Sequence, residues 1–416
     1  MKMVRRLRRP LSHNLLRVAW PIALARLAQV LLGNVDFVMV GRISTDALAA
    51  VGVATTVMHM LLIVGFSIAF GLSTTLAHAL GRGDRAQAGK DIWHGVWFGL
   101  SLGLVAFGIV RTGAPALLTI MGLEGTLHEL ALQYSRVFAF GLIPMMTTAM
   151  VNSCFAAYSR TLHLLVSSIL MTGVNLAGDY ALIFGHWGCP ELGVEGAALA
   201  SVIANLVSAT YLIGTLIVQR RAFHLSFRLR PVALLETWRR IVRLGIATTA
   251  EWCLWFFGIV LLNSWLSAYG AAALAVFNVS LKLQGLFMLM AQGIVTANNV
   301  YVGQVYGAGS LLRVGLVNRR SLTLALLSLV PGILILALIP VQAFGLFMDA
   351  DAIARLPSPR ALGAQMAILL VVRTLNTSAG SSLRSMGVLV FIVWMLLLSQ
   401  SLLVGSAFIM LKVYAW

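Results

Sequence analysis

Residues 47–80 read ALAAVGVATTVMHMLLIVGFSIAFGLSTTLAHAL and contain no lysine, arginine, aspartate or glutamate. A helix needs about 20 mostly apolar residues to cross the hydrocarbon core of a bilayer, so this stretch predicts a transmembrane helix. Similar runs between polar or glycine-rich breaks give eleven candidate spans along the chain. They lie at 15–40, 47–80, 91–112, 128–155, 162–184, 193–218, 240–266, 273–306, 316–347, 361–384 and 387–411. The pattern predicts an all-α polytopic membrane protein.

The composition of the 416 residues agrees with this prediction. Hydrophobic residues make up 60% of the chain and charged residues 10%, whereas a soluble domain carries about 25% charged residues. Three cysteines, none of them in a Cys-x-x-Cys pair, exclude a disulfide scaffold and a cysteine-rich metal site. No P-loop, Gly-x-Ser-x-Gly or His-Glu-x-x-His motif is present. We therefore expect neither an enzyme nor a bound cofactor.

The net charge of +17 is explained by membrane topology. Basic residues punctuate the apolar runs, whereas a nucleic-acid-binding face would gather them on one solvated surface. With the N-terminus in the cytoplasm, 20 of the 30 lysines and arginines fall in cytoplasmic segments and 5 in external ones, as the positive-inside rule requires. We expect a multi-pass protein of the bacterial inner membrane, with a cytoplasmic N-terminus and no nucleic-acid partner.

An internal repeat divides the chain. An offset of 226 residues aligns Ala47-Leu48-Ala49 with Ala273-Leu274-Ala275, and Gly81-x-Gly83 with Gly307-x-Gly309. Chance matching of abundant small residues is the alternative, but the matches are separated and share one rhythm of runs and breaks. The repeat predicts two pseudo-symmetric helical bundles, of six spans and of five or six, around a central cavity. The predicted parts are an amino-terminal lobe (1–218), a cytoplasmic linker (219–240) and a carboxy-terminal lobe (241–416).

Three acidic residues lie well inside apolar runs: Asp36, Asp179 and Glu251. A charged side chain at the bilayer centre costs roughly 2.5–3.5 kcal/mol on insertion scales, so each needs a reason to be there. Asn175 lies four residues before Asp179, which places both on one helix face. Two acids that share a dry pocket can take up and release a proton near neutral pH, and the amide can help coordinate a small cation.

The alternative is that each acid pairs with a basic residue and locks the bundle. This alternative is strongest for Glu251, because Lys282 and Arg373 also lie inside spans of the second half. Pro21 lies early in the first span, where a proline removes a backbone hydrogen bond and can bend the helix. It is also tolerated near a helix start, so both interpretations of Pro21 stay open.

Several stretches together match one family of transporters. They are Pro21 through Asp36 into MVGRISTDALAAVGVA (39–54), LGRGDRAQAG (80–89), GVNLAGDYALIFG (173–185), LGVEGAALAS (192–201) and, more weakly, ALAVFNV (273–279) and YGAG (306–309). With these motifs the chain resembles the multidrug and toxic compound extrusion (MATE) family. The resemblance covers most of the first half of the chain and implies two six-helix lobes. It also implies export of cationic or amphipathic compounds in exchange for protons or Na⁺.

The resemblance further implies a proton- or cation-coupling site, with Na⁺ as a possible ion, at Asp36, Asn175 and Asp179, and a helix bend at Pro21. In some members a carboxylate matched here by Glu251 takes part in a second sodium site. Its partner aspartate aligns with Arg373, whose positive charge would repel Na⁺, so Glu251, Arg373 and Lys282 form only a possible second-lobe site. The family's twelfth span is expected to be missing, because residue 416 follows directly after the eleventh.

The expected function is a cation-coupled secondary antiporter that exports organic cations or amphipathic drugs in exchange for protons or Na⁺. We expect a monomer within the lipid bilayer. One alternative is a flippase of the same broad superfamily that moves a lipid-linked oligosaccharide or its precursor, with Arg26, Lys282 and Arg373 lining a cationic cavity. Such flippases have more spans than we count here. Another alternative is a membrane protein that does not transport.

Overall fold

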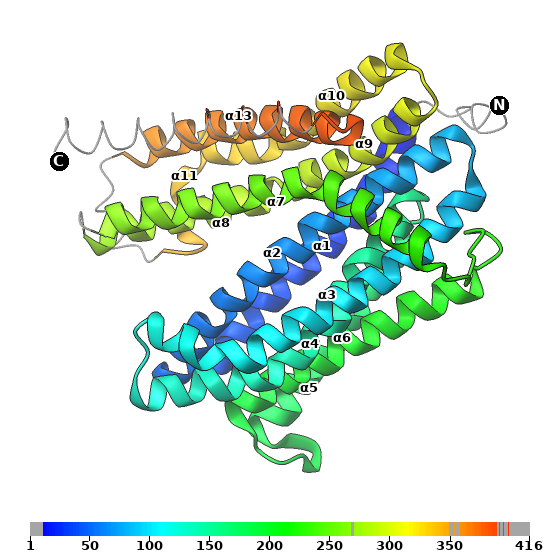
Figure 1. Ribbon diagram of the computed structural model, residues 1–416. Coiled ribbons are helices and arrows are strands. Elements are labelled where there is room, and N and C mark those ends of the chain that lie inside the picture. The colour runs from blue at the N-terminus through cyan, green and yellow to red at the C-terminus, as the bar shows by residue number, and fades with distance from the viewer. Residues whose placement is uncertain are drawn as a thin grey trace. The chain divides into compact units, whose positions relative to one another are not determined.

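The computed structural model describes residues 11–267, 270–348 and 358–388, together with the single positions 353, 391, 394 and 398. Regular secondary structure in these residues is helical (Figure 1). The helices are α1 (Leu11–Gly41), α2 (Thr45–Arg82), α3 (Arg85–Ile120), α4 (Gly125–Ala157), α5 (Leu162–Phe184), the short η2 (His186–Gly188), α6 (Gly193–Val218), α7 (Pro231–Ser267), α8 (Ala271–Phe287), α9 (Leu289–Gly307), α10 (Leu311–Leu338), α11 (Pro340–Gly345) and α13 (Pro359–Met386).

Eight of these helices, α1 to α7 and α10, are long and apolar enough to cross a membrane. The predicted span 273–306 is not a single rod, because α8 and α9 meet at Met288 with a bend of 55°. Counting that bent pair as one span gives nine among the described residues. The predicted span 387–411 lies almost wholly outside the described residues. The prediction of an all-α polytopic protein is confirmed.

Short polar and glycine signals set the helix ends. The side chain of Ser44 accepts a hydrogen bond from Ala47 N at 2.9 Å and caps α2, and Asp84 caps α3 in the same way. Gly83 ends α2 with a left-handed φ of 80°, and Gly309, 226 residues later, follows α9 with a φ of 76°. Glycine adopts this conformation without steric cost. The repeated Gly-x-Gly motif therefore ends a helix in both halves of the chain.

One compact unit runs from Leu24 to Ile246. Within it α4 packs against α2, α3 and α6, and α5 packs against α6 (Figure 1). The largest fully buried side chain of α4 is Phe155, which meets Phe223 edge to face with ring centroids 5.2 Å apart. This unit holds Asp36, Asn175 and Asp179.

The other unit combines the residues before Leu24 with those after Ile246. In it α9, α10 and α13 pack against one another. The start of α1 belongs here, because the hydroxyl of Tyr301 on α9 donates to Asn14 O at 3.4 Å. Polar side chains join the packed helices, as where Asn298 donates to Ser382 Oγ at 2.9 Å.

Two helices belong to both units. The division passes through α1 between residues 23 and 24 and through α7 between residues 246 and 247. The segment expected to link the lobes, 219–240, is not a separate linker, because α7 begins within it at Pro231. The first turns of α7, up to Ile246, belong to the Leu24–Ile246 unit.

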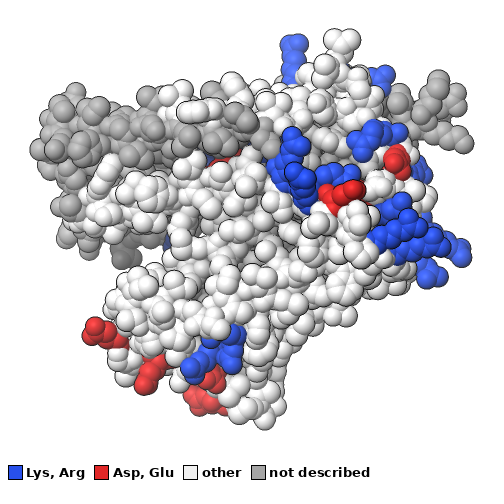
Figure 2. All heavy atoms as spheres, viewed as in Figure 1, with Lys and Arg blue, Asp and Glu red and all other residues white. Residues whose placement is uncertain are grey.

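Charged side chains are unevenly distributed on the Leu24–Ile246 unit. Figure 2 shows lysine and arginine gathered near the end of α6 and the start of α7, with a largely uncharged surface beside them. Such an uncharged band is the surface that contacts lipid in a membrane protein.

Candidate functional site

Hydroxyl groups on α5 hold this helix against its neighbours. Ser168 Oγ donates to the backbone oxygen of Ala25 on α1 at 2.8 Å, and Ser167 shares a 2.7 Å hydrogen bond with Ser208 on α6. Two turns further along α5, Asn175 and Asp179 are each only 1% exposed. The four-residue spacing predicted from the sequence therefore presents both side chains to the interior of the unit.

The carboxyl groups of Asp36 on α1 and Asp179 on α5 lie within hydrogen-bonding reach of each other. Two ionised carboxylates only accept hydrogen bonds, so a hydrogen bond between them requires a proton on one of them. Both oxygens of Asp179 are buried, and neither has another hydrogen-bond partner among the described residues. The geometry of the pair therefore suits one proton held between two acids.

Asn175 completes this group. In the amide orientation that satisfies its neighbours, Nδ2 donates to both carboxyl oxygens of Asp36, at 3.0 and 3.2 Å. The other amide atom faces the hydroxyl of Ser201 on α6, 3.5 Å away. Hydrogen bonds to an ionised carboxylate are stronger than neutral ones, so Asn175 favours the charged form of Asp36. Asp36, Asn175 and Asp179, predicted as one site, lie together, and we call them the candidate coupling site.

A tyrosine that the sequence did not single out lies near this site. Tyr134 on α4 is buried and lies within electrostatic range of both Asp36 and Asp179. Its ring stacks on Phe138 with centroids 5.4 Å apart. One tyrosine in an apolar helix gives no sequence signal of its own, and only its position near Asp36 and Asp179 in the structure identifies it.

Pro21 lies within α1, and the helix continues through it. Pro21 itself is buried. A proline cannot donate to the carbonyl four residues earlier, so α1 lacks one backbone hydrogen bond at this point. The division between the two units falls two residues later, between Ala23 and Leu24. The helix is thus weakened near the place where it passes from one unit to the other.

The three residues of the possible second-lobe site have separate partners. Glu251 on α7 forms an ion pair with Arg384 on α13, not with Lys282 or Arg373 as the sequence suggested. The guanidinium of Arg373 lies 5.0 Å from the ring centroid of Trp255 and donates to Gln284 at 3.2 Å.

The ammonium of Lys282 lies 5.9 Å from the ring centroid of Phe347.

Among the described residues, no group of three or more histidine, cysteine or acidic side chains is placed to hold a metal ion.

A buried acid at the start of α3 was missed by the sequence analysis. Asp91 is 0% exposed. Its Oδ1 accepts hydrogen bonds from Thr237 at 2.9 Å and from Arg240 at 3.0 Å, both on α7. Gln87 of its own helix donates to the same oxygen at 2.9 Å. This network fastens the first turns of α7 to α3.

Comparisons with known proteins show which proteins this chain is similar to. A family model described as MatE matches residues 21–181 and 248–409. A probable multidrug resistance protein NorM of Synechocystis is 28% identical over 355 residues, covering 82% of this chain and 74% of that protein. A protein of the same description from Thermotoga maritima is 26% identical over 340 residues, covering 81% and 72%.

A solved structure has nearly the same fold. It is described as the outward-facing conformation of a multidrug resistance MATE family transporter of the MOP superfamily. The likeness has a TM-score of 0.87 at 21% sequence identity, covering 98% of this chain and 90% of the other. This likeness confirms the predicted fold class of two helical bundles.

Proposed function

Because this chain belongs to the MatE family of multidrug efflux transporters, we propose that it exports organic cations or amphipathic drugs in exchange for protons. The family consists of transporters, so the chain is not an enzyme. We further propose that it acts as a monomer in the bacterial inner membrane, with its N-terminus in the cytoplasm and a small-molecule substrate as its main partner.

The contact between the carboxyl groups of Asp36 and Asp179 supports the proposal of proton coupling. Asp179 is buried and Asp36 is partly buried, and such a pair binds one proton readily because two ionised carboxylates in contact repel each other. Arrival of a cationic substrate makes the doubly ionised form more favourable and releases that proton. A difference of one pH unit across the membrane contributes about 1.4 kcal/mol per proton, which drives export without ATP.

Protons suit this site better than Na⁺ does. In the orientation that satisfies its neighbours without a cation, the amide of Asn175 donates to Asp36, and an N–H donor does not coordinate a cation. Sodium would need oxygen ligands, so the amide would have to turn over and lose its bonds to Asp36. Coordination of Na⁺ by Asp36, Asn175 and Asp179 is therefore the second candidate.

Pro21 links the protonation state to helix shape in this proposal. Protonation of the candidate coupling site changes how α1 is held against α5, and α1 bends where its hydrogen bonding is weakest. The position of Pro21 close to the division between the units supports this role.

In the second lobe, we propose that Glu251 acts with Arg384 as a tie between α7 and α13, because its charge is already matched. A flippase is not favoured, since the relatives described above are named multidrug resistance proteins.

Transport in proteoliposomes under an imposed pH gradient or an imposed Na⁺ gradient tests the proposal. We expect a pH gradient alone to drive export of a cationic dye, and Asp36→Asn to abolish it. Asp46→Asn is the matched control, because Asp46 lies exposed in the first turn of α2. Dye export driven only by Na⁺, or unaltered in Asp36→Asn, would overturn proton coupling at this site.

A further inference from the structure

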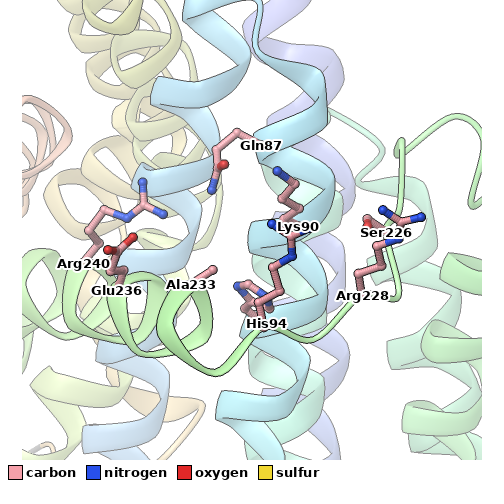
Figure 3. Close-up of a pocket in the computed structure, with 9 residues that line it drawn as sticks. Gln87, Lys90, His94, Ser226, Arg228, Ala233, Glu236 and Arg240 are labelled. Carbon is pink, nitrogen blue, oxygen red and sulfur yellow. The ribbon is translucent and has the colours of Figure 1, made fainter.

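A basic hollow lies between α3 and the start of α7, well away in the sequence from the candidate coupling site. Its volume is about 320 Å³, within the range of small-molecule sites of roughly 300–1,000 Å³. Figure 3 shows Lys90 and His94 of α3, Arg228 and Arg240 around it. Arg228 belongs to residues 219–230 between α6 and α7, which we call the connecting segment, and Arg240 belongs to α7. Arg230 also lines the hollow. We call it the α3–α7 hollow.

The walls of this hollow are fixed by contacts between segments far apart in the sequence. Gly89 on α3 touches the connecting segment so closely that an added Cβ would lie 1.7 Å from His224 O. Trp238 Nε1 of α7 donates to His94 O at 3.0 Å. Arg240 is held by the buried Asp91 at 3.0 Å. A concave site built in this way is more organised than a row of solvated loop arginines.

Arg240 is paired with Asp91, but three other cations of the hollow have no ion-pair partner among the described residues. Within the described part of the chain, no acidic side chain forms an ion pair with Lys90, Arg228 or Arg230. Glu236 is the acidic residue of its lining. A second hollow of about 620 Å³ shares Lys90 and adds Arg220 and Arg221. Several cations around a concavity attract an anion, and arginine forks fit phosphate oxygens well.

Exposed apolar side chains beside the hollow indicate where the anion comes from. In the connecting segment, Phe227 and Leu229 alternate with the arginines and are 43% and 44% exposed. In the first turns of α7, Val232 and Leu235 are 74% and 68% exposed. The rings of Trp93 and Phe227 meet edge to face, with their centroids 5.0 Å apart. Aromatic residues of this kind gather where a membrane meets water. A phospholipid offers both a phosphate for the arginines and acyl chains for this apolar rim.

We propose that the α3–α7 hollow binds the phosphate group of an anionic phospholipid, through Lys90, Arg228 and Arg230. Basic pockets between helices on the cytoplasmic side bind such head groups in other membrane proteins. The bound lipid holds the first turns of α7 against α3. Because α7 belongs to both compact units, the lipid sits at the start of a helix that connects them. This site is independent of the coupling ion proposed above.

Binding of soluble short-chain phosphatidylglycerol to the purified full-length protein tests this proposal. Native mass spectrometry counts the bound lipid, with short-chain phosphatidylcholine and inorganic phosphate as separate probes. The variants are Arg228→Ala/Arg230→Ala and, from the other wall, Lys90→Ala. The matched control is Arg319→Ala/Arg320→Ala, which removes the same charge from exposed positions on α10.

We expect saturable binding of phosphatidylglycerol, at least tenfold tighter than that of phosphatidylcholine. Binding weakens at least tenfold in Arg228→Ala/Arg230→Ala and severalfold in Lys90→Ala, but is unchanged in the control. Equal weakening in the control would show diffuse charge attraction and overturn the site. Inorganic phosphate that binds as tightly as phosphatidylglycerol would identify a free anion and overturn the assignment to lipid.

Discussion

Asp36 and Asp179 are separated by 143 residues of sequence, yet their carboxyl groups lie within hydrogen-bonding reach of each other. The contact joins α1 to α5 inside one compact unit. Under the proposal that one proton serves both acids, the two residues are expected to act as a single functional group.

Neutralising either acid should therefore have nearly the same effect as neutralising both. We expect Asp36→Asn and Asp179→Asn each to lower pH-driven dye export at least about 100-fold. The double variant should be no worse, since residues that act as a unit are strongly non-additive. The initial rates of dye export by the three variants, with Asp46→Asn as the control, measure these losses. Losses that simply multiply would indicate two independent sites.

Asn175 should set the pH at which the site works. Its amide donates to the carboxylate of Asp36, and a hydrogen bond to a charged group contributes about 1.5–3 kcal/mol. Without that donor the protonated form is favoured, so a higher pH is needed to release the proton. We expect Asn175→Ala to move the pH profile of export upward by about one unit. A profile that stays in place, or moves downward, contradicts this role. Asn205→Ala on α6 is the control, because in the described structure that amide donates to Ser201 O of its own helix.

The ion pair between Glu251 and Arg384 should stabilise the folded protein. Their side chains are only 17% and 12% exposed, and removing one partner of a buried ion pair costs about 3–5 kcal/mol. We expect either single variant, Glu251→Gln or Arg384→Gln, to have a clearly lower thermal unfolding temperature in detergent than the wild type. The double variant Glu251→Gln/Arg384→Gln should recover most of that loss, because it leaves no unpaired charge. Additive losses would rule out a direct pair.

Asp91 should hold the start of α7 in place. Asp91→Asn removes the charge that faces Arg240, whose side chain is 43% exposed, so we discount the loss for solvent screening. We expect a loss of about 1–2 kcal/mol and faster hydrogen exchange in the first turns of α7. Asp84→Asn on the same helix is the control, since asparagine also caps a helix start. Unchanged exchange near residues 231–240 would contradict the fastening role.

Pro21 should affect turnover more than binding. Alanine restores the missing backbone hydrogen bond of α1 and straightens the helix. We expect Pro21→Ala to slow export about tenfold while the affinity for a cationic dye stays within about twofold. An equal loss of binding and turnover would assign Pro21 a purely structural role.

The sequence predicts the candidate coupling site because ionisable residues are conspicuous in an apolar run. Asp36 and Asp179 are recognised by their cost in a bilayer, and Asn175 by its spacing on one helix. Tyr134 carries no comparable cost, so only three-dimensional packing identifies it.

The other differences arise from long-range contacts. Asp91 follows a lysine near a helix start and looks solvated, but residues 146 positions later bury it. Arg384 looks like a span end, but α13 continues to Met386 and places it beside Glu251. The bend at Met288 has no proline or glycine at that position to signal it.

The most direct test of the central claim is proton release on substrate binding. Addition of a cationic dye to the purified protein in weakly buffered detergent, followed with a pH indicator, counts the protons released. We predict about one proton for each dye bound by the wild type and none in Asp36→Asn/Asp179→Asn. Dye binding without proton release, or equal release from that double variant, would contradict the claim.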